Sequence, residues 1–221
     1  MTPYGNIEAV LLDWDGTLLD SFEADTAAYL RMFRALGIGW GLEELAKHYS
    51  PDWYQVYRAA RIPRDRWREA DRLWRRAYEN YRPELVAGAR QVLRRLGSRY
   101  RLGLVTSGDS QRVISQLRRL RLTSRFAVRV CHEDTPRSKP HPAPLLAALD
   151  RMRLAPAAAV YVGDAPEDVE MARRAGVRAV GVLGSFPTAR RLRASRPDVL
   201  LDSLRELPAL LERWSGARRK R

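Results

Sequence analysis

The sequence predicts an α/β fold, a doubly wound, Rossmann-like parallel sheet with a small all-helical domain inserted after the first strand. Short apolar segments alternate with helical patterns from residue 84 onward, whereas residues 20–83 are helical throughout. The 221 residues are 45% hydrophobic, which is enough to fill a core. Alternation of strands and helices builds parallel sheets with helices on both faces. We therefore predict a core domain of residues 1–19 and 84–221 and a helical domain of residues 20–83.

The first predicted strand covers residues 7–12, a short and mostly apolar segment typical of a buried strand. It runs directly into Asp13 and Asp15, which flank Trp14. Adjacent strand residues face opposite ways, so we expect Trp14 to point into the core, away from the two acids. Two carboxylates thus lie where a buried strand emerges.

The helical domain follows at once. Asp20 and Glu23 have the spacing of a capping box, and Ser50 before Pro51 has the pattern of a second helix start. Spacings of three and four mark one apolar helical face further along, formed by Trp67, Ala70, Trp74, Ala77 and Tyr81.

The core domain then continues with five predicted strands, at residues 101–106, 126–130, 158–163, 178–182 and 198–201. Helical patterns separate most of them, for example at residues 111–120 and 166–175. In such sheets, ligands bind beyond the carboxyl ends of the strands. We expect the functional groups at this edge.

Polar residues do follow the predicted strand ends. The second strand ends in Thr106, Ser107 and Gly108, and the fourth is followed by Asp164 and, slightly later, Asp168; Lys139 lies in a proline-rich loop after the third strand. Together with Asp13 and Asp15, these groups form one candidate site.

The chain is strongly basic, with a formal net charge of +14. The arginines are spread along the whole sequence, and the only dense basic run is the tail at residues 217–221. No zinc-finger spacing, basic zipper or aromatic RNA-binding pattern accompanies them. We interpret most of the basic residues as solvent-exposed surface that attracts small anions. A polyanion partner such as nucleic acid is the less favoured alternative.

Nothing in the sequence indicates export or a membrane. The first residues lack the pattern of a secretory leader, and no apolar run approaches the roughly 18 residues of a spanning helix. Cys131 is the only cysteine and cannot form an internal disulfide. We expect a cytoplasmic protein with no membrane partner.

Four motifs carry a resemblance to a known family. In order and spacing, four segments resemble the motifs of the haloacid dehalogenase (HAD) superfamily. They are Asp13-Trp-Asp15-Gly-Thr, Thr106-Ser-Gly, Ser-Lys139-Pro and Gly-Asp164-Ala-Pro-Glu-Asp168. The helical insert is similar to the cap of its phosphoglycolate phosphatase-like branch. The resemblance implies a Mg²⁺-dependent phosphatase that hydrolyses a small phosphomonoester, phosphoglycolate-like or a sugar phosphate, through an aspartyl-phosphate.

The resemblance also implies roles for individual residues. Asp13 would be the nucleophile, and Asp15 would protonate the leaving alcohol and then activate water. Magnesium would be held by Asp13, the backbone carbonyl of Asp15, and Asp164, with Asp168 supporting the site through a metal-bound water or Lys139. The second aspartate favours phosphoryl transfer over dehalogenation.

The phosphate site is predicted at the end of the second strand. The hydroxyl of Thr106 and the amides of Ser107 and Gly108, which lead into a helix amino end, suit an anion. Lys139 adds a compact positive charge. Two alternatives stay open: a phosphomutase of the same fold, and a noncatalytic polyanion-binding protein.

Overall fold

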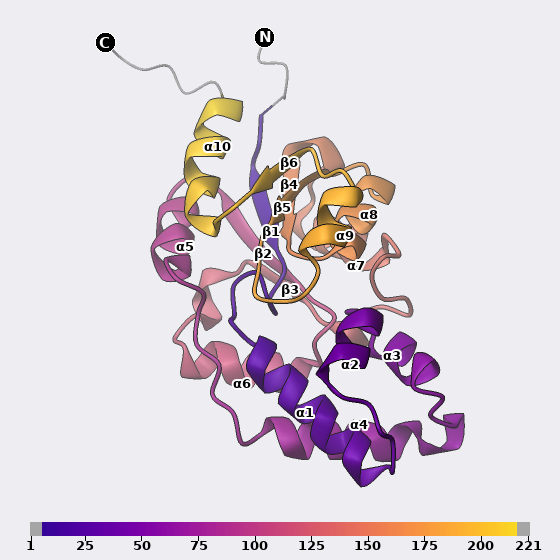
Figure 1. The fold of residues 1–221 in the computed structure, drawn as a ribbon. Coiled ribbons are helices and arrows are strands. Elements are labelled where there is room, and N and C mark those ends of the chain that lie inside the picture. The colour runs from indigo at the N-terminus through magenta and orange to yellow at the C-terminus, as the bar shows by residue number, and fades with distance from the viewer. Residues whose placement is uncertain (1–5, 216–221) are drawn as a thin grey trace. The chain divides into compact units, whose positions relative to one another are not determined.

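The computed structural model describes residues 6–215. It divides into two compact units, which we name the core unit (Met1–Leu19 with Leu85–Arg221) and the helical unit (Asp20–Glu84). Figure 1 shows both units. The basic tail noted in the sequence, residues 217–221, lies outside the described residues.

The core unit contains a six-stranded parallel sheet in the order β3-β2-β1-β4-β5-β6. The strands are β1 Ala9–Leu12, β2 Arg101–Val105, β3 Val128–Val130, β4 Ala159–Gly163, β5 Arg178–Val182 and β6 Val199–Leu201. Each lies within its predicted range, and the predicted α/β fold with a helical insertion after the first strand is confirmed.

Helices cover both faces of the sheet. Alternate strand residues point to opposite sides, and because those on both sides are apolar, both faces must be shielded from water. In β1, Val10 and Leu12 belong to one apolar core, and Ala9 and Leu11 belong to the other. The first core also takes side chains from α5 Ala89–Gly97, α6 Ser110–Arg119 and α10 Leu207–Trp214. The second takes them from α7 Ala143–Met152, α8 Pro166–Arg174 and α9 Ala189–Ala194.

The strand order fixes where the loops emerge. β1 lies between β2 and β4, and Leu12 is in register with Leu104 and Val162. The residues that follow these three strands therefore leave the sheet side by side, at the point where the chain order reverses.

Short 3₁₀ helices occur at Arg64–Arg66, Thr123–Arg125, His132–Asp134, Pro156–Ala158 and Leu204–Glu206.

The helical unit consists of α1 Phe22–Ala35, α2 Leu42–His48, α3 Trp53–Ala59 and α4 Trp67–Tyr78. It has its own core, in which Tyr29, Met32 and Phe33 of α1 pack with Ala70 of α4. The predicted apolar face of α4 is present up to Ala77; Tyr81 lies beyond the helix end and packs on the same side.

Both predicted helix starts in this unit were wrong by one or two residues. The N-cap of α1 is Ser21 rather than Asp20. The N-cap of α3 is Asp52, whose carboxylate accepts a hydrogen bond from the Tyr54 amide, so that Pro51 lies before the helix. Several residues in each segment can serve as caps, and packing decides among them.

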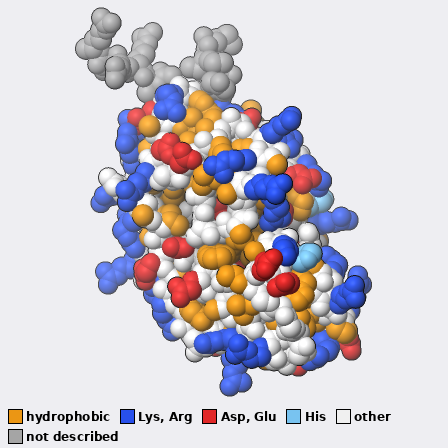
Figure 2. All heavy atoms as spheres, viewed as in Figure 1, with side chains coloured by type: hydrophobic (Ala, Val, Ile, Leu, Met, Phe, Trp, Pro, Cys, Tyr) orange, Lys and Arg blue, Asp and Glu red, His pale blue; other side chains and the backbone are white. Residues whose placement is uncertain are grey.

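Basic residues are distributed along the whole sequence. Figure 2 shows Lys and Arg side chains scattered over the visible face with acidic side chains between them, not gathered in one patch. Within residues 6–215, none of the helices combines the length and the apolar character that crossing a membrane requires.

Candidate active site

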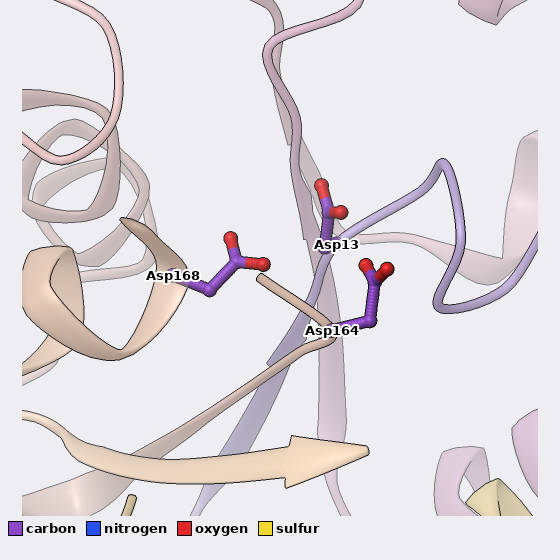
Figure 3. Close-up of side chains that lie close together, drawn as sticks. All are labelled: Asp13, Asp164 and Asp168. Carbon is purple, nitrogen blue, oxygen red and sulfur yellow. The ribbon is translucent and has the colours of Figure 1, made fainter. Parts of the chain in front are cut away.

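Three buried carboxylates meet at the carboxyl edge of the sheet. Asp13 follows β1, Asp164 follows β4, and Asp168 lies in the first turn of α8. One carboxylate oxygen from each lies within 4.8 Å of the other two. Figure 3 shows the three side chains converging from these separate segments.

Lys139 joins this carboxylate cluster from the loop between β3 and α7. Its ammonium donates a hydrogen bond to Oδ1 of Asp13 at 2.6 Å and lies 2.7 Å from Oδ1 of Asp168. The side chain is only 2% exposed. A buried ammonium requires such partners, because an unpaired charge inside a protein is costly.

The electrostatics of the cluster are dominated by burial and by an excess of negative charge. Burial raises the pKa of Asp13 to about 7 even though Lys139 opposes the shift. Burial and the neighbouring Asp13 and Asp168 raise the pKa of Asp164 well above its ordinary value. For Lys139, burial lowers the pKa, but Asp13 and Asp168 outweigh it, so the net pKa is raised.

This donor set fits a divalent cation. Three carboxylates and one ammonium, all buried, carry two excess negative charges when ionised. Lys139 balances only one of the three carboxylate charges. Burial first, and repulsion between the carboxylates second, raise the pKa of Asp13 and of Asp164. An all-oxygen set of carboxylates suits a hard ion of charge +2.

Asp164 is held in place by two threonine hydroxyls. Thr17 donates to its Oδ1 at 3.1 Å, and Thr188 donates to its backbone carbonyl at 2.7 Å. Gly16 passes directly beside it with φ of +80°, and a Cβ there would lie 2.3 Å from Oδ2 of Asp164. Only glycine combines this backbone conformation with the close approach.

Asp168 is held in a similar way from the other side. The Tyr161 hydroxyl lies 3.1 Å from its Oδ1, and the Ala165 amide donates to its Oδ2 at 3.1 Å. A Cβ at Gly163 would lie 2.3 Å from this carboxylate. Both oxygens therefore have fixed partners, and Oδ1 is also the atom that faces Lys139.

The loop after β2 lies on the neighbouring strand. Thr106 is buried, and its hydroxyl accepts a hydrogen bond from the Gly108 amide at 3.0 Å, so this amide is already used within the loop. The Ser107 oxygen differs: it is shielded from solvent and has no hydrogen-bond partner among residues 6–215. A buried hydroxyl without a partner is suited to donate a hydrogen bond to a ligand.

Asp15 does not join the carboxylate cluster. Its Oδ1 and Oδ2 accept hydrogen bonds from Nη1 and Nη2 of Arg112, at 2.9 and 2.7 Å. Arg112 lies in the first turn of α6, just after the loop that contains Thr106. The predicted acid/base residue is thus paired with an arginine to which the sequence analysis gave no role.

The structure therefore gathers Asp13, Lys139, Asp164 and Asp168 at one point and places the Thr106–Gly108 loop on the adjacent strand. The contributions of Thr17, Tyr161, Arg112 and Thr188 were missed from sequence. Thr17 alone carried a signal, since it belongs to the first motif.

Comparison with known proteins identifies the family. The model of the haloacid dehalogenase-like hydrolase family matches residues 10–182. A phosphoglycolate phosphatase from Nitrosococcus oceani is 31% identical over 220 residues, covering 92% of this chain and 96% of the relative.

Among the solved structures that share the fold are two at 25% identity to this chain. A haloacid dehalogenase-like family hydrolase from Streptococcus pneumoniae has a TM-score of 0.81 at 25% identity, covering 93% of this chain and 98% of that one. A Thermotoga maritima protein named after β-phosphoglucomutase has a TM-score of 0.71 at 25% identity, covering 94% and 99%. The chain belongs to the haloacid dehalogenase-like hydrolase family.

Proposed function

We propose that this protein is a Mg²⁺-dependent phosphatase that hydrolyses a small phosphomonoester through an aspartyl-phosphate on Asp13. The observation that carries the proposal is the buried Asp13 carboxylate, hydrogen-bonded to Lys139 and grouped with Asp164. A carboxylate is a weak nucleophile, and a fixed position beside positive charge is what makes it effective.

Asp13, Asp164 and the backbone carbonyl of Asp15 would hold the magnesium ion. When bound, the ion neutralises charge on the phosphate and on the carboxylates, so that an anion can approach Asp13. Asp168 contacts the hydroxyl of Tyr161 and the ammonium of Lys139, so it would hold Lys139 in place beside the metal site.

The residues of the chain supply the remaining chemistry. Asp13 attacks phosphorus and forms an acyl phosphate, while Asp15 gives a proton to the departing alcohol oxygen. Asp15 then takes a proton from the water that attacks the acyl phosphate and releases inorganic phosphate. The hydroxyls of Thr106 and Ser107 and the ammonium of Lys139 bind the phosphoryl oxygens.

The substrate class is a small phosphorylated metabolite, and phosphoglycolate is the first candidate because the Nitrosococcus oceani relative is named for it. The helical unit would be the cap that excludes bulk water during attack. It is inserted between β1 and α5, directly after the loop that carries Asp13 and Asp15.

A phosphomutase is the second candidate, favoured by the likeness to the Thermotoga maritima protein. The two candidates differ in product, because a mutase transfers the phosphoryl group to a sugar and a phosphatase releases inorganic phosphate. We expect stoichiometric phosphate release from a panel of phosphoglycolate and sugar phosphates with Mg²⁺. An isomeric sugar phosphate without free phosphate would identify the mutase.

The test of the nucleophile is Asp13→Asn. We expect kcat to fall by about 10³-fold or more, since the amide cannot form the acyl phosphate. Asp20→Asn, at an exposed aspartate of the helical unit, is the matched control and should keep full activity. Unchanged turnover in Asp13→Asn would overturn the proposal.

A further inference from the structure

Arg112 makes a two-point polar contact with Asp15, and the proposed mechanism gives this arginine no role. It reaches from the first turn of α6 to Asp15, and both Nη atoms donate to separate carboxylate oxygens at 2.9 and 2.7 Å. The two side chains are 15% and 23% exposed. A partly buried two-point contact between a guanidinium and a carboxylate fixes orientation as well as charge.

Arg112 is itself held from two sides. Its Nε lies 3.7 Å from Oδ2 of Asp109, and its Nη1 lies 3.4 Å from Oε1 of Gln116. The same Gln116 oxygen accepts a hydrogen bond at 2.8 Å from the indole N–H of Trp14. Trp14 is fully buried and directly precedes Asp15 in the sequence. A closed set of contacts therefore runs from the end of β1 through α6 and back to Asp15.

The guanidinium also lies directly on the phosphate-binding loop. A Cβ at Gly108 would be 2.4 Å from Nη2 of Arg112, so the absence of a side chain at this position makes room for the arginine. Arg112 thus connects the acid/base residue to the loop that contains Thr106 and Ser107. The planar fork is required for this, since an ammonium would reach only one point.

We propose that Arg112 is a positioning residue that fixes the carboxyl group of Asp15 for proton transfer to the leaving oxygen. This rests on the proposed function, in which Asp15 is the acid and base. Because both oxygens of Asp15 accept from Arg112 in the structure, the acid form needs one of these two contacts to open. The oxygen that is released carries the proton and gives it to the alcohol oxygen as the phosphorus–oxygen bond breaks and the bond to Asp13 forms, and the other oxygen keeps its contact with Arg112. The carboxylate that results then regains the two-point contact.

The test is Arg112→Lys, which keeps the charge and loses the two-point contact. An alkyl phosphate needs a proton donor for its leaving group, whereas 2,4-dinitrophenyl phosphate does not. We expect kcat for the alkyl ester to fall by about 10- to 100-fold, and kcat for the dinitrophenyl ester to change by less than about threefold, with KM nearly constant for both.

Two further variants separate positioning from structure. Arg118→Lys makes the same change at an exposed site on the same helix and should leave both reactions unaffected. In an Asp15→Asn background, Arg112→Lys should reduce kcat by less than about twofold, because the residue through which it acts is gone. Arg112→Gln repeats the series, and circular dichroism establishes that each variant is folded.

Three results would overturn the inference: equal losses for both esters, losses that multiply in the Asp15→Asn background, or a KM increase confined to substrates with a second anionic group. The last would make Arg112 a substrate-binding residue. Failure of the proposed function is distinct, since the wild-type protein would then release no phosphate or Asp13→Asn would stay active.

Discussion

The hydroxyl of Ser107 is the one polar side-chain group of the proposed phosphate loop that is shielded from solvent without a partner in the described part of the chain. A buried polar group without a hydrogen bond costs free energy, and a bound phosphoryl oxygen would remove that cost. Ser107 therefore favours the anion-bound state of the loop. Its neighbour Thr106 already accepts the Gly108 amide and has only its hydroxyl proton to offer.

We predict that Ser107→Ala weakens phosphate binding without destabilising the fold. A hydrogen bond to a charged group contributes roughly 1.5–3 kcal/mol, so the inhibition constant of inorganic phosphate should rise about 10-fold or more. The melting temperature should not fall, since the lost hydroxyl has no partner in the described chain.

The control for this prediction is Ser98→Ala, which removes an exposed hydroxyl that donates to the Arg95 carbonyl. It should leave the inhibition constant unchanged. A Ser107→Ala protein that binds phosphate as well as the wild type would show that the hydroxyl does not contact the anion.

For individual residues, the sequence was sufficient to predict those that follow the strands. An acidic residue directly after a short apolar run can be recognised from a few neighbouring residues. The sequence could not identify Arg112, because no motif marks this arginine among the many others of the chain and its partner Asp15 lies 97 residues away. The same applies to Thr188, whose hydroxyl reaches the Asp164 carbonyl from a loop 24 residues further along. Only the folded packing of α6 and of the loop before α9 reveals these partners.

The elements were predicted more completely than their ends. Strand ranges follow from short apolar runs, and all six strands lie inside the predicted ranges. Helix starts are less certain from sequence, because Asp20 and Ser21 are adjacent cap residues and both are compatible with α1.

We predict that Phe33→Ala destabilises the helical unit by about 3–5 kcal/mol, because its ring is completely buried between α1 and its neighbours. Chemical denaturation followed by circular dichroism would measure the loss. Leu42→Ala in α2 is the control, since Leu42 is 50% exposed and should change stability by less than about 0.5 kcal/mol. Equal effects would contradict the separate core of this unit.

For the molecule as a whole, the distribution of charge matters more than its sum. The net charge of +14 coexists with a buried cluster that is negative. Composition alone could not predict this, because a formal charge says nothing about which ionised groups are buried. On the face that Figure 2 shows, basic side chains are scattered with acidic ones between them and form no single basic patch, which favours the enzyme over the polyanion-binding alternative.

The buried cluster predicts a pH dependence of stability in metal-free protein. Because the folded-state pKa of Asp13 is raised to about 7 from an ordinary 3.8, its contribution to stability is fully present below pH 4 and is lost as the pH rises through 7. Asp164 shifts in the same direction. We expect the melting temperature of Asp164→Asn protein to fall less between pH 5 and pH 8 than that of the wild type.

Scanning calorimetry after chelator treatment would measure this difference, with Asp20→Asn as the exposed control. Adding millimolar Mg²⁺ should raise the wild-type melting temperature more at pH 8 than at pH 5, because the ion binds the ionised carboxylates. Identical pH slopes for the wild type and Asp164→Asn would show that the cluster does not govern stability in this range.

The position of β1 in the sheet has a consequence for how the protein is made. Ala9 pairs with Arg101 on one side and with Ala159 on the other, so the earliest strand in the chain needs partners that are translated much later. Contacts of such long sequence separation slow folding. Asp13, which directly follows β1, therefore cannot reach its final surroundings until the segments that contain β2 and β4 have been translated.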